Sequence, residues 1–186
     1  MSEFNENDLS AIKNLFTVIT VVLILCSLWV FVFKEEAHAM SQFKETKQQR
    51  VETMLKGIDE KFPSIKQLSV SDIENINNYL FVDVRENEER KISKIPSSIS
   101  LTEFLKDSEK YFSSNKAIVF YCTIGYRSSV AAQQFKGKNV ANLRGSLISW
   151  AWNGKELVDS KNNKTKKIHV YGRKWDLLPE AYSGQY

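Results

Sequence analysis

The sequence predicts an α/β fold, a central parallel sheet flanked by helices, preceded by one N-terminal transmembrane helix. Three observations support this prediction. After residue 64, short apolar runs typical of buried strands alternate with helical patterns. An uncharged apolar run fills residues 15–33. A loop with cysteine, glycine and arginine joins one predicted strand to the next helix, where parallel sheets place their ligands.

The run from Leu15 to Phe33 contains no charged residue. At about 1.5 Å per residue, a helix of this length comes close to crossing a hydrocarbon core of roughly 30 Å. We therefore predict a single-pass membrane helix after a short tail, residues 1–14. A cleaved signal peptide, ending near the small residues Ala37 and Ala39, is the main alternative, and a buried core helix is another. The length of the run and the acidic start of the chain favour an uncleaved anchor.

The flanking cations predict the orientation of this helix. Only Lys13 precedes the run, whereas Lys34, Lys44, Lys47 and Arg50 follow it. In a bacterial inner membrane, the positive-inside rule then places the C-terminal domain in the cytoplasm. A periplasmic domain is the alternative.

Residues 34–63 are predicted to be a juxtamembrane linker. Val51, Met54, Leu55 and Ile58 have helical spacing, which indicates a helix that ends near Lys61. The many charged and polar residues around them favour a solvated spacer.

Residues 64–160 carry the predicted α/β domain. The apolar runs predict strands at 65–70, 79–83, 117–121 and 140–143. The helical patterns predict helices at 71–78, 100–112, 128–136 and 147–152, the first starting at a Ser71/Glu74 capping box. Asp83 and Cys122 each lie at the carboxyl end of a predicted strand, so we expect them at the same edge of the sheet.

Residues 161–186 form a basic and aromatic C-terminal extension, with a predicted strand at 168–171. We expect it to pack on the domain. A cover over the active-site mouth and a basic patch for anionic lipid are the alternatives. His169 has no cysteine or acidic neighbour in sequence and is interpreted as structural.

Composition excludes several classes of function. The net charge is only +4, and no basic stripe is interleaved with aromatic residues, so we predict no nucleic-acid partner. No metal-ligand spacing, phosphate-binding glycine loop or dinucleotide fingerprint occurs, so we predict no metal and no cofactor. Two cysteines, one of them in the apolar run, build no disulfide framework. Cys122 is therefore expected to be a free thiol.

The loop of residues 122–128, Cys-Thr-Ile-Gly-Tyr-Arg-Ser, is typical of a reactive thiolate. A helix start, the fixed cation of Arg127 and backbone N–H groups turned inward should each lower the pKa of the Cys122 thiol. Gly125 supplies the backbone freedom that such a turn needs. A buried, inert cysteine is the alternative interpretation.

Three segments resemble the rhodanese-like sulfurtransferases. Residues 82–86 (Val-Asp-Val-Arg-Glu), with Ile95-Pro96 and Ile99, are similar to the family's "DVRE…HIPGAI" segment. The second segment is the cysteine loop, and the third is residues 142–145 (Asn-Leu-Arg-Gly) with Trp150. The resemblance covers about residues 65–159 and implies the three-layer rhodanese fold.

The resemblance also implies a chemistry. Cys122 would take a sulfane sulfur from a small-molecule or protein donor, become a persulfide and pass the sulfur to a thiol acceptor. Arg85 would shape the pocket, and Asp83 would support the site by bracing Arg127 or the loop backbone. A purely structural Asp83–Arg85 ion pair is the alternative. The residues that would bind the persulfide are those of the loop together with Arg85: Thr123, Ile124, Gly125, Tyr126, Arg127 and Ser128.

Loop length favours sulfur transfer over phosphate hydrolysis. Cys122 and Arg127 are separated by four residues, whereas the related phosphatases carry one more to encircle a phosphate. A phosphatase or arsenate-reductase-like enzyme and a non-catalytic docking module at the membrane are the rival functions. The uncharged Thr123 and Ile124 and the bulky Tyr126 depart from the pattern of enzymes that act on thiosulfate. With these departures, a persulfide is as good a candidate for the sulfur donor as thiosulfate.

Overall fold

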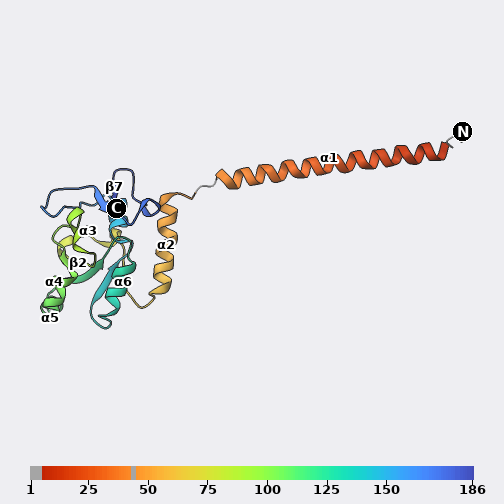
Figure 1. The fold of residues 1–186 in the computed structure, drawn as a ribbon. Coiled ribbons are helices and arrows are strands. Elements are labelled where there is room, and N and C mark those ends of the chain that lie inside the picture. Colours follow the sequence, from red (N-terminus) through yellow and green to blue (C-terminus); the bar gives the residue numbers. More distant parts are fainter. Residues whose placement is uncertain (1–5, 43–44) are drawn as a thin grey trace. The chain divides into compact units, whose positions relative to one another are not determined.

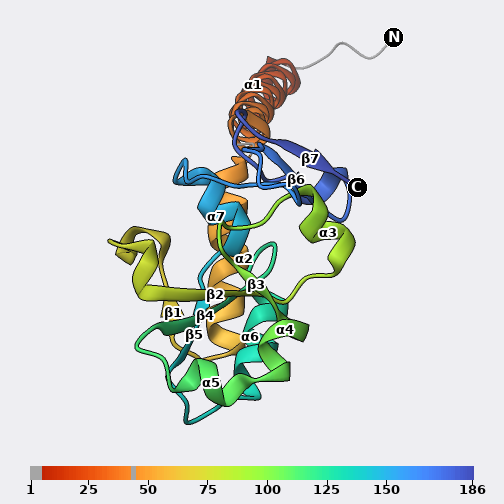
Figure 2. The same cartoon turned by 90° about the vertical axis from the view of Figure 1, so that its left-hand side faces the viewer.

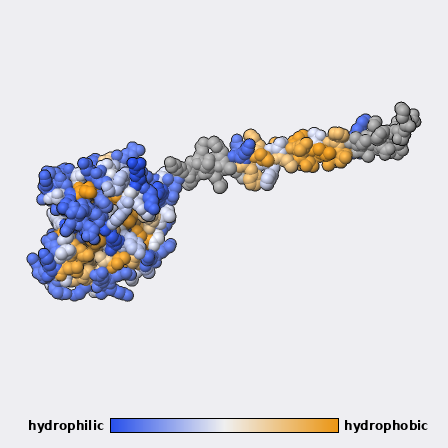
Figure 3. Space-filling view, viewed as in Figure 1, coloured by the Kyte–Doolittle hydropathy of each residue, from blue (hydrophilic) through white to orange (hydrophobic). Residues whose placement is uncertain are grey.

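The computed structural model describes residues 6–42 and 45–186 and divides into two compact units, Met1–Glu45 and Thr46–Tyr186. The first unit holds helix α1 (Glu6–Gln42). Within it, Lys13–Glu35 is long and apolar enough to cross a membrane, and its side chains are exposed (Figure 3). The hydroxyls of Thr17, Thr20 and Ser27 donate to carbonyls three or four residues earlier. These donors are therefore satisfied within the helix itself. Such a helix is typical of a membrane anchor and also of a signal sequence.

The second unit, which carries the labels α2, β2 and α6 in Figure 1, is built on a five-stranded parallel sheet with strand order β1-β5-β4-β2-β3. The predicted α/β class with a central parallel sheet is confirmed. In the central pair, Asp83 lies opposite Tyr121, so both strands end at one edge of the sheet. The strands are β1 (Gln67–Leu68), β2 (Tyr79–Asp83), β3 (Ile99–Ser100), β4 (Ala117–Tyr121) and β5 (Val140–Leu143).

Aromatic residues on β4 mark the two faces of the sheet. Phe120 packs on Phe104 and Phe135, at ring-centroid distances of 5.4 and 5.5 Å. Its neighbour Tyr121 points to the opposite face, where Phe81 also contacts Trp150. Figure 2 shows helices α4, α5 and α6 together on one side of the strands and α7 on the other. These helices are α4 (Leu101–Lys106), α5 (Ser108–Phe112), α6 (Tyr126–Gln133) and α7 (Ser146–Trp152).

Two helix predictions are wrong in detail. The predicted helix over 100–112 is interrupted at Asp107, whose φ of −151° is not helical, so α4 and α5 are separate. The predicted helix over 71–78 consists of two 3₁₀ turns, η1 (Val70–Asp72) and η2 (Ile76–Asn78). The Ser71 hydroxyl donates to Asp72 and does not cap a helix. The short helix α3 (Asn87–Ile92) was not predicted.

Helix α2 (Lys47–Lys61) belongs to the second unit and is not a solvated spacer. Thr46 and Gln49 form its capping box, and its apolar stripe of Val51, Leu55 and Ile58 is buried. The compact unit therefore begins at Thr46, earlier than the predicted residue 64.

The C-terminal segment adds a small parallel pair, β6 (Lys167–His169) with β7 (Ser183–Gln185). Ile168, Val170, Leu177 and Leu178 are buried and join the main core. The segment thus packs on the sheet domain, with a third 3₁₀ turn η3 (Arg173–Trp175) at its surface.

Candidate active site

Cys122 directly follows β4 and is 2 % exposed. Its backbone N–H donates to the Ser146 hydroxyl at 3.0 Å, and its carbonyl accepts from the Leu147 N–H at 3.3 Å. Both partners lie at the start of α7, which fixes the cysteine between the end of β4 and this helix.

The Cys122 sulfur is surrounded by hydrogen-bond donors. The Gly125 N–H lies 3.1 Å from Sγ, and the Ser128 hydroxyl lies 3.5 Å from it. Backbone N–H groups of Ile124 and Ser128 also point at the sulfur. Gly125 makes this turn possible, because its φ of +112° is a conformation that side-chain-bearing residues rarely adopt. The predicted inward-facing nest of N–H groups is therefore present.

These donors lower the pKa of the Cys122 thiol. Burial alone would raise it, but the Ser128 hydroxyl and the N–H groups of Ser128, Gly125 and Ile124 outweigh burial. The direction agrees with the sequence prediction, but the leading causes are neutral donors of the loop. The thiolate is the form that attacks sulfur, so the arrangement suits a nucleophile.

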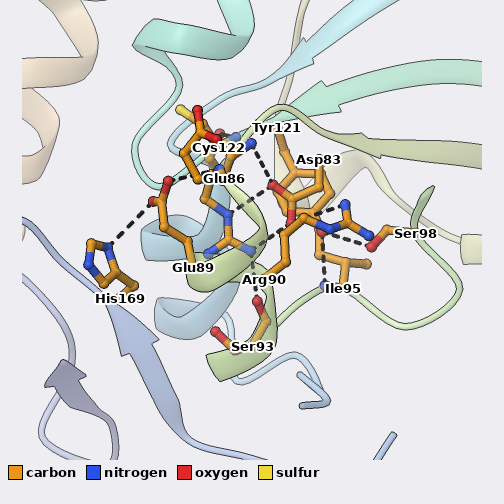
Figure 4. A network of polar contacts seen from close by, with 12 residues as sticks. Asp83, Glu86, Glu89, Arg90, Ser93, Ile95, Ser98, Tyr121, Cys122 and His169 are labelled. Carbon is orange, nitrogen blue, oxygen red and sulfur yellow. Dashed lines mark hydrogen bonds and ion pairs between the residues drawn. The ribbon is translucent and has the colours of Figure 1, made fainter. Parts of the chain in front are cut away.

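Arg127 is bound by an acidic partner outside the loop. Its two terminal nitrogens donate to Glu89 of α3 at 2.9 and 2.8 Å. The ring of Tyr171 covers the guanidinium at 5.3 Å. Burial would raise the pKa of Glu89, but the bonds from Arg127 and the Glu86 N–H lower it, so the pair is ionised. His169 lies 3.5 Å from the same carboxylate (Figure 4).

The predicted brace from Asp83 to Arg127 is wrong. Asp83 is fully buried and binds the guanidinium of Arg85 with both oxygens, at 2.9 and 2.6 Å. Arg90 approaches the same carboxylate at 3.7 Å, and Arg85 also donates to the Ser93 carbonyl at 2.7 Å. Figure 4 shows this network beneath the cysteine. Asp83 and Arg85 therefore form the structural ion pair that was the alternative, and neither side chain lines the cavity at Cys122.

Sequence reasoning missed Glu89 and Ser146 as parts of this site. The sequence contains a pattern that could have indicated Glu89, because it stands three residues after Glu86 and completes the capping box of α3. Ser146 directly follows the Asn-Leu-Arg-Gly segment, and no sequence pattern marked it as part of the site. In the structure its φ is +47°, and its hydroxyl accepts from Cys122 and donates to the Leu143 carbonyl at 3.1 Å.

A cavity of about 260 Å³ opens beside Cys122. The loop supplies part of its wall, through Thr123, Ile124, Tyr126 and Arg127. Gly125 and Ser128 face the sulfur instead. Within residues 6–42 and 45–186, no three His, Cys, Asp or Glu side chains gather where a metal ion could bind.

Residues 69–153 match the family model of the rhodanese-like domain. The chain contains a rhodanese-like domain. The five-stranded parallel sheet with its helices is the α/β rhodanese fold that the motifs predicted. The match includes the cysteine loop and Glu89, and it excludes α2 and the C-terminal segment.

Solved structures with similar folds include proteins from several organisms. A thiosulfate sulfurtransferase from Pseudomonas aeruginosa is 18% identical, with a TM-score of 0.48 over 59% of this chain and 23% of that chain. This chain therefore spans less than a quarter of that protein. A rhodanese-related protein from Thermoplasma volcanium is 29% identical, with a TM-score of 0.42 over 50% of this chain and 97% of its own. A rhodanese-like domain protein from Staphylococcus aureus is 24% identical, with a TM-score of 0.38 over 46% of this chain and 91% of its own. The search of curated protein sequences gave no match.

Proposed function

We propose that this protein is a sulfurtransferase that carries a sulfane sulfur as a persulfide on Cys122. The observation that carries the proposal is the ring of donors around the Cys122 sulfur, from Gly125, Ile124 and Ser128. Such donors stabilise a thiolate before the reaction and a persulfide anion after it. The rhodanese-like domain supports the same chemistry, because members of the family that Cys122 and its loop resemble transfer sulfur in this way.

The reaction would proceed in two exchange steps. The Cys122 thiolate attacks the outer sulfur of a donor, the bond from that sulfur to the donor breaks, and the donor group leaves with the electron pair. A thiol acceptor, as its thiolate, then attacks the outer sulfur of the persulfide and releases Cys122 as a thiolate. Both nucleophiles and both leaving groups are stabilised anions, so no general base is needed.

We further propose that α1 is an uncleaved, single-pass membrane anchor, with the rhodanese-like domain in the cytoplasm. The exposed apolar stretch Lys13–Glu35 supports the anchor, and the excess of cations after it supports the orientation. A reactive thiol also suits a reducing compartment. Fusion of a periplasm-dependent reporter to the C-terminus tests the orientation, and an active reporter would contradict it.

Intact mass measurement tests the catalytic claim. The full chain in detergent is incubated with thiosulfate or with a low-molecular-weight persulfide, and one added sulfur is expected. The Cys26→Ser variant, which keeps Cys122 as its only cysteine, should gain the same sulfur, and Cys122→Ser should gain none. A chain that gains no sulfur from any donor would contradict catalysis and favour a docking module.

A phosphatase on the same fold would be detected by turnover of a chromogenic aryl phosphate. We expect no turnover, because both terminal nitrogens of Arg127 are bound to Glu89 and are not turned into the loop. Turnover that Cys122→Ser abolishes would contradict the proposal.

A further inference from the structure

The cavity at Cys122 has walls that the family match does not include. Met54 comes from α2, while Val170 and Leu177 come from the C-terminal segment. Ile148 of α7 completes this apolar lining. The substrate side of the site is thus shaped by segments on either side of the matched domain.

Aromatic side chains form the rim of the same cavity. Tyr126, Tyr171 and Trp175 are 42 %, 60 % and 40 % exposed, and they come from the loop and the C-terminal segment. Exposed large apolar side chains gathered at one place commonly mark a binding site. A second apolar hollow, which includes Gly57 and Ile58 of α2, shares these three aromatic residues and extends the surface.

The cavity offers no uncompensated positive charge. Among the residues that the structure describes, Arg127 is the only charged side chain that lines it, and Glu89 and the Tyr171 ring already occupy its guanidinium. Lys61 and Lys174 lie against the rings of Tyr126 and Trp175, at 4.9 and 5.0 Å, but do not line the cavity. A charged group that enters the cavity without an oppositely charged partner loses hydration free energy. A dianion such as thiosulfate should therefore bind weakly here.

One polar group in the wall is unused. Thr123 is 7 % exposed, and its hydroxyl oxygen is buried without a hydrogen-bond partner among residues 6–42 and 45–186. It follows Cys122 in the chain and lines the same cavity. The oxygen itself is inaccessible, so it contacts a ligand in the cavity only if the Thr123 side chain rotates.

We propose that the cavity selects persulfide donors with a small, uncharged apolar body over thiosulfate and over charged persulfides. The proposal rests on the proposed function and names its substrate class. The apolar body lies against Ile148, Val170 and Leu177, and the outer sulfur faces Cys122. The Cys122 thiolate forms a bond to the outer sulfur of R–S–SH, the S–S bond of the donor breaks, and R–S⁻ leaves with the electron pair.

A donor series tests the proposal. Persulfide formation on the full chain is followed by intact mass with ethyl, propyl and butyl persulfide, cysteine persulfide and thiosulfate. We expect kcat/KM to rise about fourfold per added methylene, since burying one contributes about 0.8 kcal/mol. Cysteine persulfide and thiosulfate should react more slowly than the butyl donor. Equal kcat/KM values for the three alkyl persulfides, or thiosulfate as the best donor, would overturn the proposal.

A substitution of the rim residue Trp175 tests whether the aromatic rim contributes to this selectivity. Trp175→Ala should lower the ratio of kcat/KM for the butyl donor to kcat/KM for thiosulfate about tenfold. Tyr186→Ala is the control, because Tyr186 is an exposed aromatic residue of the same segment, 66 % exposed, that does not line the cavity. All proteins are measured in one detergent, so partition of a given donor into micelles cancels when a variant is compared with wild type.

The two proposals fail in different ways. If no donor places a sulfur on Cys122, the sulfurtransferase function itself is wrong. If thiosulfate and cysteine persulfide load Cys122 but the alkyl series is flat and Trp175→Ala behaves like Tyr186→Ala, only the apolar selectivity is wrong.

Discussion

Glu89 of α3 binds the guanidinium of Arg127 of α6 with both carboxylate oxygens, at 2.8 and 2.9 Å. The cation of the cysteine loop is therefore neutralised by a residue 38 positions away in the sequence. Thiolate stabilisation then depends on neutral donors, while the ion pair holds the first turn of α6 in place. This division of roles explains how the cavity at Cys122 is apolar although its loop contains an arginine.

Glu89→Gln is expected to destabilise the domain. Glu89 is 4 % exposed, and removing one partner of a largely buried pair leaves the other charge unpaired. We expect a loss of about 2 kcal/mol, which lowers Tm by roughly 6 °C. Thermal unfolding of the full chain measures this, with the exposed Glu88→Gln of the same helix as control, where little change is expected. Because Arg127 regains a net charge, the rate with thiosulfate relative to butyl persulfide should rise. An unchanged Tm would contradict the role of the pair.

The lowered pKa of Cys122 predicts a pH-dependent stability. Below the unfolded thiol pKa of about 8.5, the unfolded chain keeps a proton that the folded chain has released. The stabilisation is therefore fully present above that pH and is lost as pH falls through the folded pKa. The Tm difference between wild type and Cys122→Ser should shrink as pH falls, whereas Cys26→Ser should follow wild type. A difference that stays constant with pH would contradict the thiolate.

Ser146 is expected to be sensitive to the choice of substitution. Ser146→Ala leaves the Cys122 N–H without its acceptor and keeps a strained positive φ, for a loss of about 2 kcal/mol. Ser146→Gly loses the same acceptor but relieves the strain, so it should be more stable than the alanine variant by about 1 kcal/mol. Thermal unfolding should rank serine above glycine above alanine. The reverse order of glycine and alanine would show that the backbone is not strained here.

The sequence predicted the parts of the site that depend on local order. The apolar runs of β2 and β4 placed Asp83 and Cys122 at one edge, and Gly125 indicated the turn around the sulfur. It did not predict that Arg127 pairs with Glu89, because several acidic residues of the domain compete for this role and only the fold brings α3 to α6.

Packing of the flanking segments was the least predictable feature. The stripe of Val51, Leu55 and Ile58 fits a solvated helix with a weak apolar face as well as a docked one, and only the sheet supplies the surface that buries it. The same holds for Val170 and Leu177 of the C-terminal segment, whose position at the cavity no local pattern encodes.

Thr123→Val is expected to separate substrate binding from stability. The Thr123 hydroxyl is buried and has no hydrogen-bond partner in the part of the chain that the structure describes, so its removal should not lower Tm. If the hydroxyl binds the sulfur that leaves the donor, persulfide formation should slow about tenfold, the value of one hydrogen bond of roughly 1.4 kcal/mol. Single-turnover mass measurement with butyl persulfide gives the rate, and Thr102→Val, at an exposed position of α4, is the control. An unchanged rate would show that Thr123 only lines the cavity, and a lower Tm would show that its hydroxyl has a structural partner.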